Sequence, residues 1–217
     1  MLSDRILESL IAVAIFIVVG FPVHEFSHAL AAYRLGDSTA RYQGRLTLNP
    51  IVHFDPLGGT LLALSAFLGG FFIGWARPTP VNPYNLRYGR RGEAIVALAG
   101  PLSNLIMAAV VAVPLRLIAS NPQMLATVMR SDAALFAYNT AAFFVVINVF
   151  LMVFNLLPIP PLDGWKVLLG LVDARTSYSL RSFEQYGFLL LLVIVFAGGS
   201  LLGGVADSII RLLLGFP

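Results

Sequence analysis

Five long apolar stretches restrict what this sequence can fold into. They cover residues 6–35, 57–75, 94–118, 133–157 and 188–214, and each is at least about as long as a helix needs to be to cross the hydrocarbon core of a bilayer. Inside a bilayer the backbone must satisfy its own hydrogen bonds, so such stretches form helices. The composition agrees, because 58% of the residues are hydrophobic and only 12% are charged. We therefore expect an all-α integral membrane protein.

The five stretches differ in how well they suit a membrane crossing. Residues 6–35 lack the cleavage site of a removable signal peptide, so we interpret them as a permanent span. The three C-terminal stretches are also good candidates for spanning helices. Residues 57–75 carry glycines near both ends and in the middle, which predicts a segment that turns back. The expected architecture is one membrane-embedded domain, residues 1–217, with about four transmembrane helices and one re-entrant or non-spanning segment.

Two polar connectors, residues 36–56 and 77–92, contain prolines and arginines. Alternating residues from Tyr42 to Leu48 allow short strands there. The chain has no cysteine, so any metal must be bound by His, Asp or Glu. The net charge of +3 includes no long basic run, so we expect the lipid bilayer and no nucleic acid as a partner.

Two histidines and a glutamate lie close together inside the first apolar stretch, in the sequence His24-Glu25-Phe26-Ser27-His28. Such residues are costly at membrane depth unless they have partners. On a helix the two histidines point the same way and can grip one ion, while Glu25 lies beside it to activate a water molecule. This is the arrangement that zinc-dependent hydrolysis needs. The alternative is a chance spacing of polar residues along a helix interface.

A catalytic zinc needs a third protein ligand, and Asp163 is the strongest candidate. It follows Pro158, Pro160 and Pro161, which end the preceding apolar stretch and force an extended backbone before the carboxylate. A broken helix in a membrane usually lines a cavity. The alternative is that Asp163 caps the helix that follows it.

The sequence resembles the site-2 protease family of intramembrane zinc metalloproteases. The resemblance is carried by the segments 24–28, 100–104 (Gly-Pro-Leu-Ser-Asn) and 155–164, in the family's order. Residues 49–56 and 78–83 also look like segments of compact bacterial and archaeal members. No stretch outside the membrane core is long enough for a PDZ or cystathionine-synthase-like module. The resemblance therefore points to a compact member of the family.

The resemblance implies a role for each matching residue. His24, His28 and Asp163 would bind one Zn²⁺ per chain, and Glu25 would be the catalytic base. Asn155 would position the substrate or stabilise the oxyanion. The expected activity is that of a zinc-dependent endopeptidase that cleaves membrane proteins in or near a transmembrane helix.

Two further polar residues near these motifs are expected to be structural. His53 could be a spare metal ligand, but a loop histidine bonded to backbone near Asp55 is the better interpretation. Asn104 is expected to hold helices together and not to act in catalysis.

The topology follows from the requirement that the ligands meet at one depth. His24 lies ten residues before Arg34, which is about 15 Å along a helix axis. If residues 57–75 crossed the bilayer, Asp163 would lie on the opposite side from Arg34, so this segment should not cross. Most basic residues then share one side, which the positive-inside rule identifies as the cytoplasm. They are Arg34, Arg41, Arg45, Arg77, Arg87, Arg90, Arg91, Lys166, Arg175 and Arg181.

We accordingly expect an active site that faces the cytoplasm from the inner (plasma) membrane of a prokaryote. The loop 120–132 and both termini would face outward. A non-proteolytic membrane zinc-binding protein or a metal transporter is the main alternative. A transporter would carry more ionisable residues across several spans, yet residues 133–157 offer only Asn139 and Asn148 as strongly polar groups in their middle. A purely structural subunit would require all three motifs to be coincidental.

Overall fold

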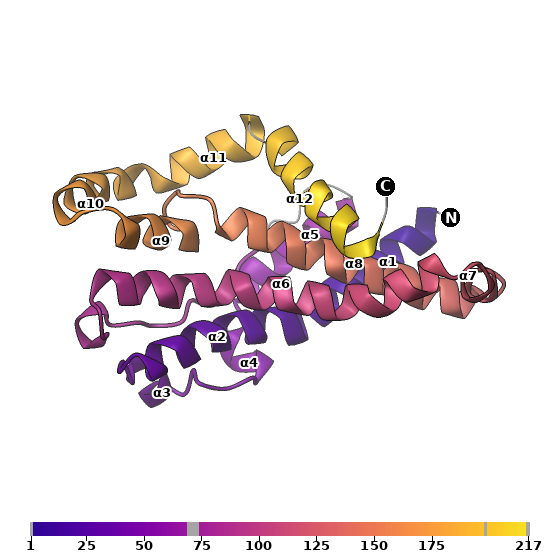
Figure 1. The fold of residues 1–217 in the computed structure, drawn as a ribbon, viewed down its shortest axis with the longest axis horizontal. Helices are drawn as coiled ribbons and strands as arrows, with labels where there is room; N and C mark the ends of the chain where they lie inside the picture. The colour runs from indigo at the N-terminus through magenta and orange to yellow at the C-terminus, as the bar shows by residue number, and fades with distance from the viewer. Residues whose placement is uncertain (1, 69–73, 198, 216–217) are drawn as a thin grey trace.

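The computed structural model describes residues 2–68, 74–197 and 199–215, and these form helices and turns without a strand. Three helical stretches are long and apolar enough to cross a membrane: Ile6–Arg34, Arg90–Ser120 and Asp132–Asn155. They pack lengthwise against one another and form the centre of the molecule (Figure 1). The fold is therefore all-helical, with three candidate membrane spans.

The first span is a continuous helix with one wider turn. It runs from α1 (Leu2–Ile15) through a π-helical turn (Phe16–Gly20) into α2 (Phe21–Arg34). Phe16 is fully buried in that turn, with its ring 4.8 Å from the ring of Phe21. A side chain at Gly20 would collide with the Phe16 ring, so glycine leaves the room that the turn requires. Such single-turn π-bulges are frequent near functional sites.

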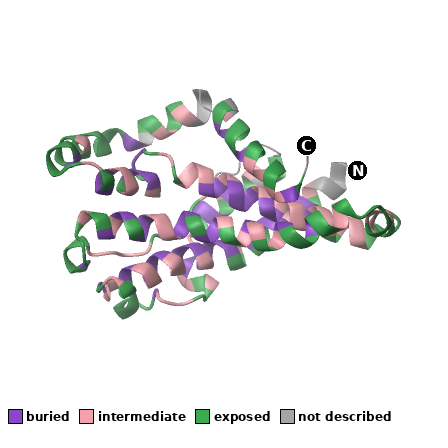
Figure 2. Ribbon diagram, viewed as in Figure 1, coloured by how far each residue is buried: buried purple, intermediate pink, exposed green. Residues whose placement is uncertain are grey.

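The second and third spans, α6 (Arg90–Ser120) and α8 (Asp132–Asn155), form a hairpin closed by α7 (Pro122–Met129). Ala108 and Ala112 of α6 are buried in one cluster with Val145 and Val149 of α8. Small residues on one helix let the two backbones approach closely. Figure 2 shows the buried residues concentrated where the three spans cross, with exposed residues at the two ends of the bundle.

The connectors contain short helices where strands were expected. Both connectors are described throughout, and they form α3 (Thr39–Tyr42), α4 (Pro50–His53) and a 3-10 turn (Pro83–Asn85). Asn49 caps α4 and Asn82 caps the 3-10 turn, and a proline follows each cap. An asparagine cap followed by proline is a helix-start signal. Residues 43–48, where alternation suggested a strand, form turns and bends, with Gly44 at a positive φ of 68°.

In the segment 57–75, the described helix packs against the first span, with Leu62 buried in the core beside Ala12 and Phe16. Its described helix is α5 (Pro56–Leu68), which is too short to count among the candidate spans, and residues 69–73 lie outside the described residues. A side chain at Gly58 would collide with the backbone carbonyl of Trp75. The Arg77 amide donates a hydrogen bond to the His53 carbonyl, 2.8 Å away. The described ends thus meet on one side, as expected for a segment that does not cross.

The single fourth span that the sequence suggested is not confirmed by the described residues of the C-terminal region. After α9 (Asp163–Leu171) and α10 (Ala174–Arg181), residues 187–214 form two helices, α11 (Gly187–Ala197) and α12 (Gly199–Leu214). Figure 1 shows these two helices meeting at an angle. Glycines at and beside the break, where residue 198 is undescribed, weaken helix continuity.

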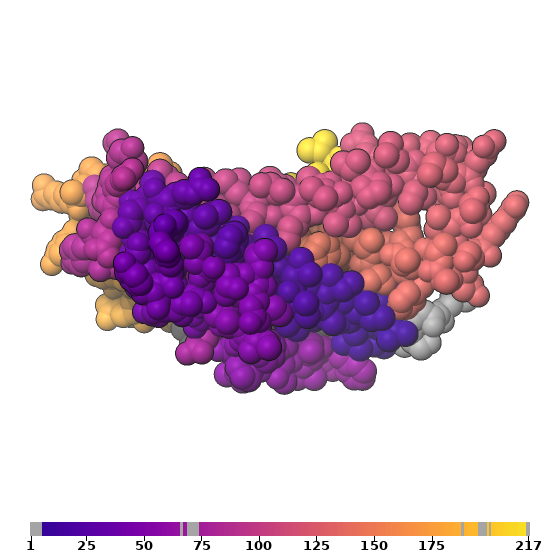
Figure 3. All heavy atoms as spheres, turned by 90° about the horizontal axis from the view of Figure 1, so that it is seen from below, coloured from indigo at the N-terminus to yellow at the C-terminus, as the bar shows by residue number. Residues whose placement is uncertain are grey.

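The two ends of the bundle carry different parts of the chain. In Figure 1, α3 and α10 lie at one end, whereas α7 and both chain ends lie at the other. Seen from below, the first third of the chain covers one half of the visible face and the α7 region forms the opposite end (Figure 3). This segregation places the connectors at a single end of the molecule.

Candidate metal centre

Two histidines of α2 point to the same place. His24 and His28 are four residues apart, so their side chains lie on one helix face. Their Nε2 atoms are 3.1 Å apart, and the rings meet edge to face. Both side chains are buried in the middle of the bundle. The spacing in the sequence therefore produces a pair of imidazole nitrogens that can share one ligand.

Asp163, the first residue of α9, completes a cluster of three donor atoms. Its Oδ2 atom lies 3.4 Å from Nε2 of His24 and 3.3 Å from Nε2 of His28. Ligands bound tetrahedrally to zinc at about 2.0–2.1 Å are themselves about 3.3–3.4 Å apart. Both the donor types and their spacing therefore fit a zinc ion with three protein ligands. Leu162, and not Asp163, is the N-cap of α9, so the helix-cap interpretation of Asp163 does not hold.

Helix α9 is fixed against α6, which sets the position of Asp163. The Nη1 atom of Arg90 lies 3.1–3.2 Å from the carbonyl oxygens of Leu169, Val172 and Asp173. It thereby satisfies carbonyls that the helix end leaves free. A side chain at Gly170 would collide with the Cβ atom of Ala94, so glycine permits close contact with α6. Contacts at the C-terminal end of α9 thus hold its N-terminal carboxylate against the histidines.

Each histidine is also oriented by a partner on α6. Nδ1 of His24 lies 3.1 Å from Oδ1 of Asn104, and Nδ1 of His28 lies 2.7 Å from the carbonyl oxygen of Val96. Because both partner atoms accept hydrogen bonds, each Nδ1 carries the proton and each Nε2 keeps its lone pair for a metal. Asn104 does connect two helices as expected, but it does so through a candidate ligand, which the sequence did not reveal.

The segment 100–104 also provides space for the two histidine rings. A side chain at Gly100 would collide with ring atoms of His28 and would lie 2.7 Å from Cε1 of His24. Only glycine leaves room for both rings at this point of α6. The glycine and the asparagine of the motif therefore act on the same pair of histidines.

Glu25 lies beside the cluster and is held by the connector that follows α5. Its Oε2 atom accepts a hydrogen bond from the Thr79 amide (2.8 Å), and its backbone oxygen accepts one from the Thr79 hydroxyl (3.0 Å). The Glu25 side chain is buried. The sequence predicted the glutamate but not its partner. The only signal for Thr79 was its place in the segment 78–83.

Two other predicted polar residues lie outside the donor cluster. Asn155, the last residue of α8, donates from Nδ2 to the carbonyl of Leu151 one turn earlier (2.9 Å) and makes no hydrogen bond to a candidate ligand in the described part of the chain. His53 is fully buried, with Nε2 2.8 Å from the carbonyl oxygen of Thr47. A structural loop histidine was expected there, and this contact agrees with it.

Comparison with known proteins places these features in a family. Residues 10–198 match the family model described as peptidase family M50. The chain is 40% identical over 205 residues to YwhC of Bacillus subtilis (strain 168), which is named as a zinc metalloprotease; the match covers 91% of this chain and 89% of YwhC. It is 32% identical over 193 residues to Rip2 of Mycolicibacterium smegmatis, named likewise, with 86% and 69% covered. The chain belongs to peptidase family M50. No solved structure matches it.

Membership identifies the chain as a zinc-dependent protease of the site-2 protease type, embedded in a membrane. Within the described residues of this M50 peptidase, His24, His28 and Asp163 form the one group of three or more acidic or histidine side chains that could hold a metal ion. A series of such sites across several spans, which a metal transporter would need, is not present in that part of the chain. Because the chain belongs to a peptidase family, the protease interpretation replaces the transporter alternative.

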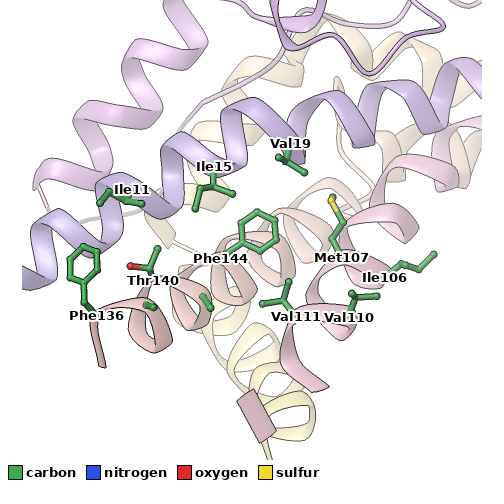
Figure 4. Close-up of a pocket in the computed structure, with 12 residues that line it drawn as sticks. Ile11, Ile15, Val19, Ile106, Met107, Val110, Val111, Phe136, Thr140 and Phe144 are labelled. Atoms are coloured by element: carbon green, nitrogen blue, oxygen red, sulfur yellow. The ribbon is translucent and has the colours of Figure 1, made fainter. Parts of the chain in front are cut away.

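The M50 peptidase also has an apolar cavity that is separate from the metal centre. Its volume is about 670 Å³, and it lies between α1, α6 and α8 (Figure 4). None of the predicted site residues lines it, and Thr140 is the only lining residue with a polar side chain. The Thr140 hydroxyl is buried without a hydrogen-bond partner among the described residues. Its lining offers no ionisable group.

Proposed function

We propose that His24, His28 and Asp163 hold one zinc ion, that Glu25 is the general base, and that Asn155 contacts the substrate. The observation that carries this proposal is the convergence of two Nε2 atoms and one carboxylate oxygen within 3.1–3.4 Å of one another. A bound zinc ion would supply Lewis acidity, which polarises a scissile carbonyl and lowers the pKa of water so that it can lose a proton and attack the carbonyl carbon.

The chain's own residues then control where protons and substrate go. The Glu25 carboxylate, next to His24 on α2, takes the proton of the attacking water and delivers it to the leaving amine. Asn104 and the Val96 carbonyl keep both imidazoles in the orientation that presents Nε2. Asn155, at the end of α8, offers an amide for a substrate backbone group. The reaction is hydrolysis of a peptide bond.

The substrates that we propose are membrane proteins cut in or near a transmembrane helix. The two histidines lie on the first apolar span and contact the second, so a peptide bond that reaches them must come from within or beside the bilayer. Residues 57–75 would enter the membrane from the connector side without crossing it. Ten basic residues lie in the connectors and near α10, which supports a cytoplasmic active site in a prokaryotic plasma membrane. Residues 1–217 would act as one domain.

The test uses Glu25→Gln, with Glu8→Gln as a matched control. Glu8 is also a buried glutamate in the first span, but it bonds to Asn139 (2.9 Å) and not to the metal centre. The purified variants are reconstituted in proteoliposomes with zinc and a panel of single-span reporter proteins tagged at both ends. Glu25→Gln should lower cleavage about 10²- to 10⁴-fold with its zinc retained, while Glu8→Gln stays active. Full activity of Glu25→Gln would refute the proposed base.

A further inference from the structure

The connector from Arg77 to Asn82 lies against α2 and is anchored at both ends. At one end the Arg77 amide donates to the His53 carbonyl, 2.8 Å away. At the other end the Asn82 amide donates to Oδ2 of Asp37, 2.7 Å away. We call these six residues the strap. Thr79, the third residue of the strap, makes two hydrogen bonds to Glu25 of α2.

The Asp37 anchor is a buried carboxylate with only neutral partners. Asp37 is fully buried and accepts hydrogen bonds from the amide and hydroxyl of Thr39, the amide of Asn82 and the side-chain amide of Asn85. A buried carboxylate is stable only when its oxygens are paired in this way. The strap therefore cannot leave α2 at this end without exposing a costly unpaired group.

The prolines on either side of Thr79 restrict its backbone. Pro78 and Pro80 have fixed φ angles and no amide hydrogen, and Pro80 disfavours the helical conformation at Thr79. Between Arg77 and Val81, Thr79 thus has the only backbone N–H group. That single donor is directed at Oε2 of Glu25. Little conformational entropy is lost in holding it there.

A general base must be held within hydrogen-bond reach of the proton that it removes. The terminal torsion of a glutamate is broad and roughly two-fold, so an unrestrained carboxylate samples many orientations. The Thr79 amide fixes Oε2, and the Thr79 hydroxyl ties the strap to the same residue's backbone. No hydrogen bond from the described residues to Oε1 accompanies the one to Oε2. One oxygen is thus restrained and the other is left for chemistry.

We infer that Thr79 is a positioning residue for the Glu25 carboxylate, which it holds through one backbone and one hydroxyl hydrogen bond from the strap. The inference rests on the proposed role of Glu25 as general base. It predicts that the hydroxyl of Thr79 affects turnover more than substrate binding. A strap that merely fastened the connector to α2 would instead change stability or zinc content.

The first experiment compares Thr79→Val, Thr79→Ser and Thr127→Val in the proteoliposome assay with the reporter that the wild type cleaves. Thr127 is a control because its hydroxyl also donates to a backbone carbonyl, 2.9 Å away, but on α7. Thr79→Val should lower kcat about fivefold with KM, zinc content and melting temperature unchanged. Thr79→Ser should restore kcat, and Thr127→Val should have no effect. An unchanged kcat in Thr79→Val, a loss confined to KM or zinc content, or failure of Thr79→Ser to restore kcat would overturn the inference.

A second measurement needs no substrate. In protein labelled with ¹⁵N-threonine, the Thr79 amide should exchange slowly with solvent, and Glu25→Ala should accelerate this exchange. The Thr39 amide, bonded to Asp37 at 3.1 Å, should not respond and serves as the internal control. Fast exchange of Thr79 in the wild type would overturn the inference. Full activity of Glu25→Gln would refute the base itself, and the exchange data would still report whether the Thr79–Glu25 bond exists.

Discussion

The two halves of the first span lie in different environments: polar groups are paired around α2, whereas α1 borders an apolar cavity. In α2, His24 and His28 each have both ring nitrogens engaged, through Asn104 or Val96 on one side and Asp163 on the other. In α1, Ile11 and Ile15 line an apolar cavity in which the Thr140 hydroxyl has no partner among the described residues. The first span and α6 thus form, with α9, a centre in which all histidine nitrogens are paired and, with α8, an apolar space.

This difference predicts at which positions the fold tolerates substitutions. Polar groups at membrane depth are stable when every one of them is paired, so removing one member leaves others unsatisfied. An unpaired hydroxyl in an apolar cavity makes no hydrogen bond, so its removal should not lower the stability of the fold. We therefore expect substitutions around the metal centre to be costly and the matching substitution in the cavity to be neutral.

The largest effect among the orienting residues is expected for Asn104→Leu. Without the amide oxygen, the proton on Nδ1 of His24 loses its acceptor, and zinc affinity should fall about 10- to 100-fold. Competition with a zinc chelator in detergent measures this. Asn148→Leu is the matched control, because Asn148 is equally buried on α8 but bonds only within its own helix. Equal zinc affinity in the two variants would show that Asn104 does not orient the ligand.

A smaller effect is expected at the strap's anchor, in Asp37→Asn. Burial by itself would raise the pKa of Asp37, but hydrogen bonds from Thr39, Asn82 and Asn85 outweigh it and lower the pKa below its usual value. The side-chain NH₂ group of an asparagine would face one of the N–H or O–H groups that now bind the carboxylate. The free energy of unfolding should therefore fall by about 1–3 kcal/mol at pH 7.

The sign of the pH dependence follows from the lowered pKa. The stabilisation by the ionised Asp37 is complete above the pKa of the unfolded chain, about 3.9, and is lost as the pH falls through the lower folded value. Wild type and Asp37→Asn should therefore converge in acid when unfolding is followed in mixed micelles. Asp132→Asn, at an exposed position, should change stability by less than about 0.5 kcal/mol. A difference between wild type and Asp37→Asn that does not shrink in acid would contradict this account.

The smallest effect is expected in the cavity. Thr140→Val replaces an unpaired hydroxyl by a methyl group of similar size, so the free energy of unfolding should stay the same or rise by up to about 1 kcal/mol. Zinc affinity and cleavage should not change. A marked loss of stability would mean that the hydroxyl has a partner, such as a lipid or water molecule, and would weaken the contrast between the two regions.

The sequence predicted best where a single helix carries the information. His24 and His28 lie on one turn of one helix, so their spacing alone gives their geometry. Asp163 was predictable because prolines end the preceding span just before it. The expectation that residues 57–75 do not cross the bilayer followed from the need for the ligands to meet. In each case a local pattern was joined to one strong physical constraint, the bilayer.

Contacts between segments were not predictable in the same way. Asn104 meets His24, and Thr79 meets Glu25, across 80 and 54 residues of sequence, and no local pattern specifies the register between helices. The strands expected from side-chain alternation in Tyr42 to Leu48 were wrong, because Gly44 has a positive φ and the backbone turns there. A single fourth span was expected from the length of residues 188–214 and is not confirmed, since two shorter helices are described there.

The central claim is that one zinc ion is held by His24, His28 and Asp163, and metal content tests it most directly. Wild type, Asp163→Ala and the control Asp207→Ala are purified in detergent without chelator, and zinc is measured by mass spectrometry. Asp207 is an exposed aspartate on α12 that pairs with Arg211. We expect about one zinc per chain in the wild type and in the control, and almost none in Asp163→Ala. A full complement of zinc in Asp163→Ala would contradict the account.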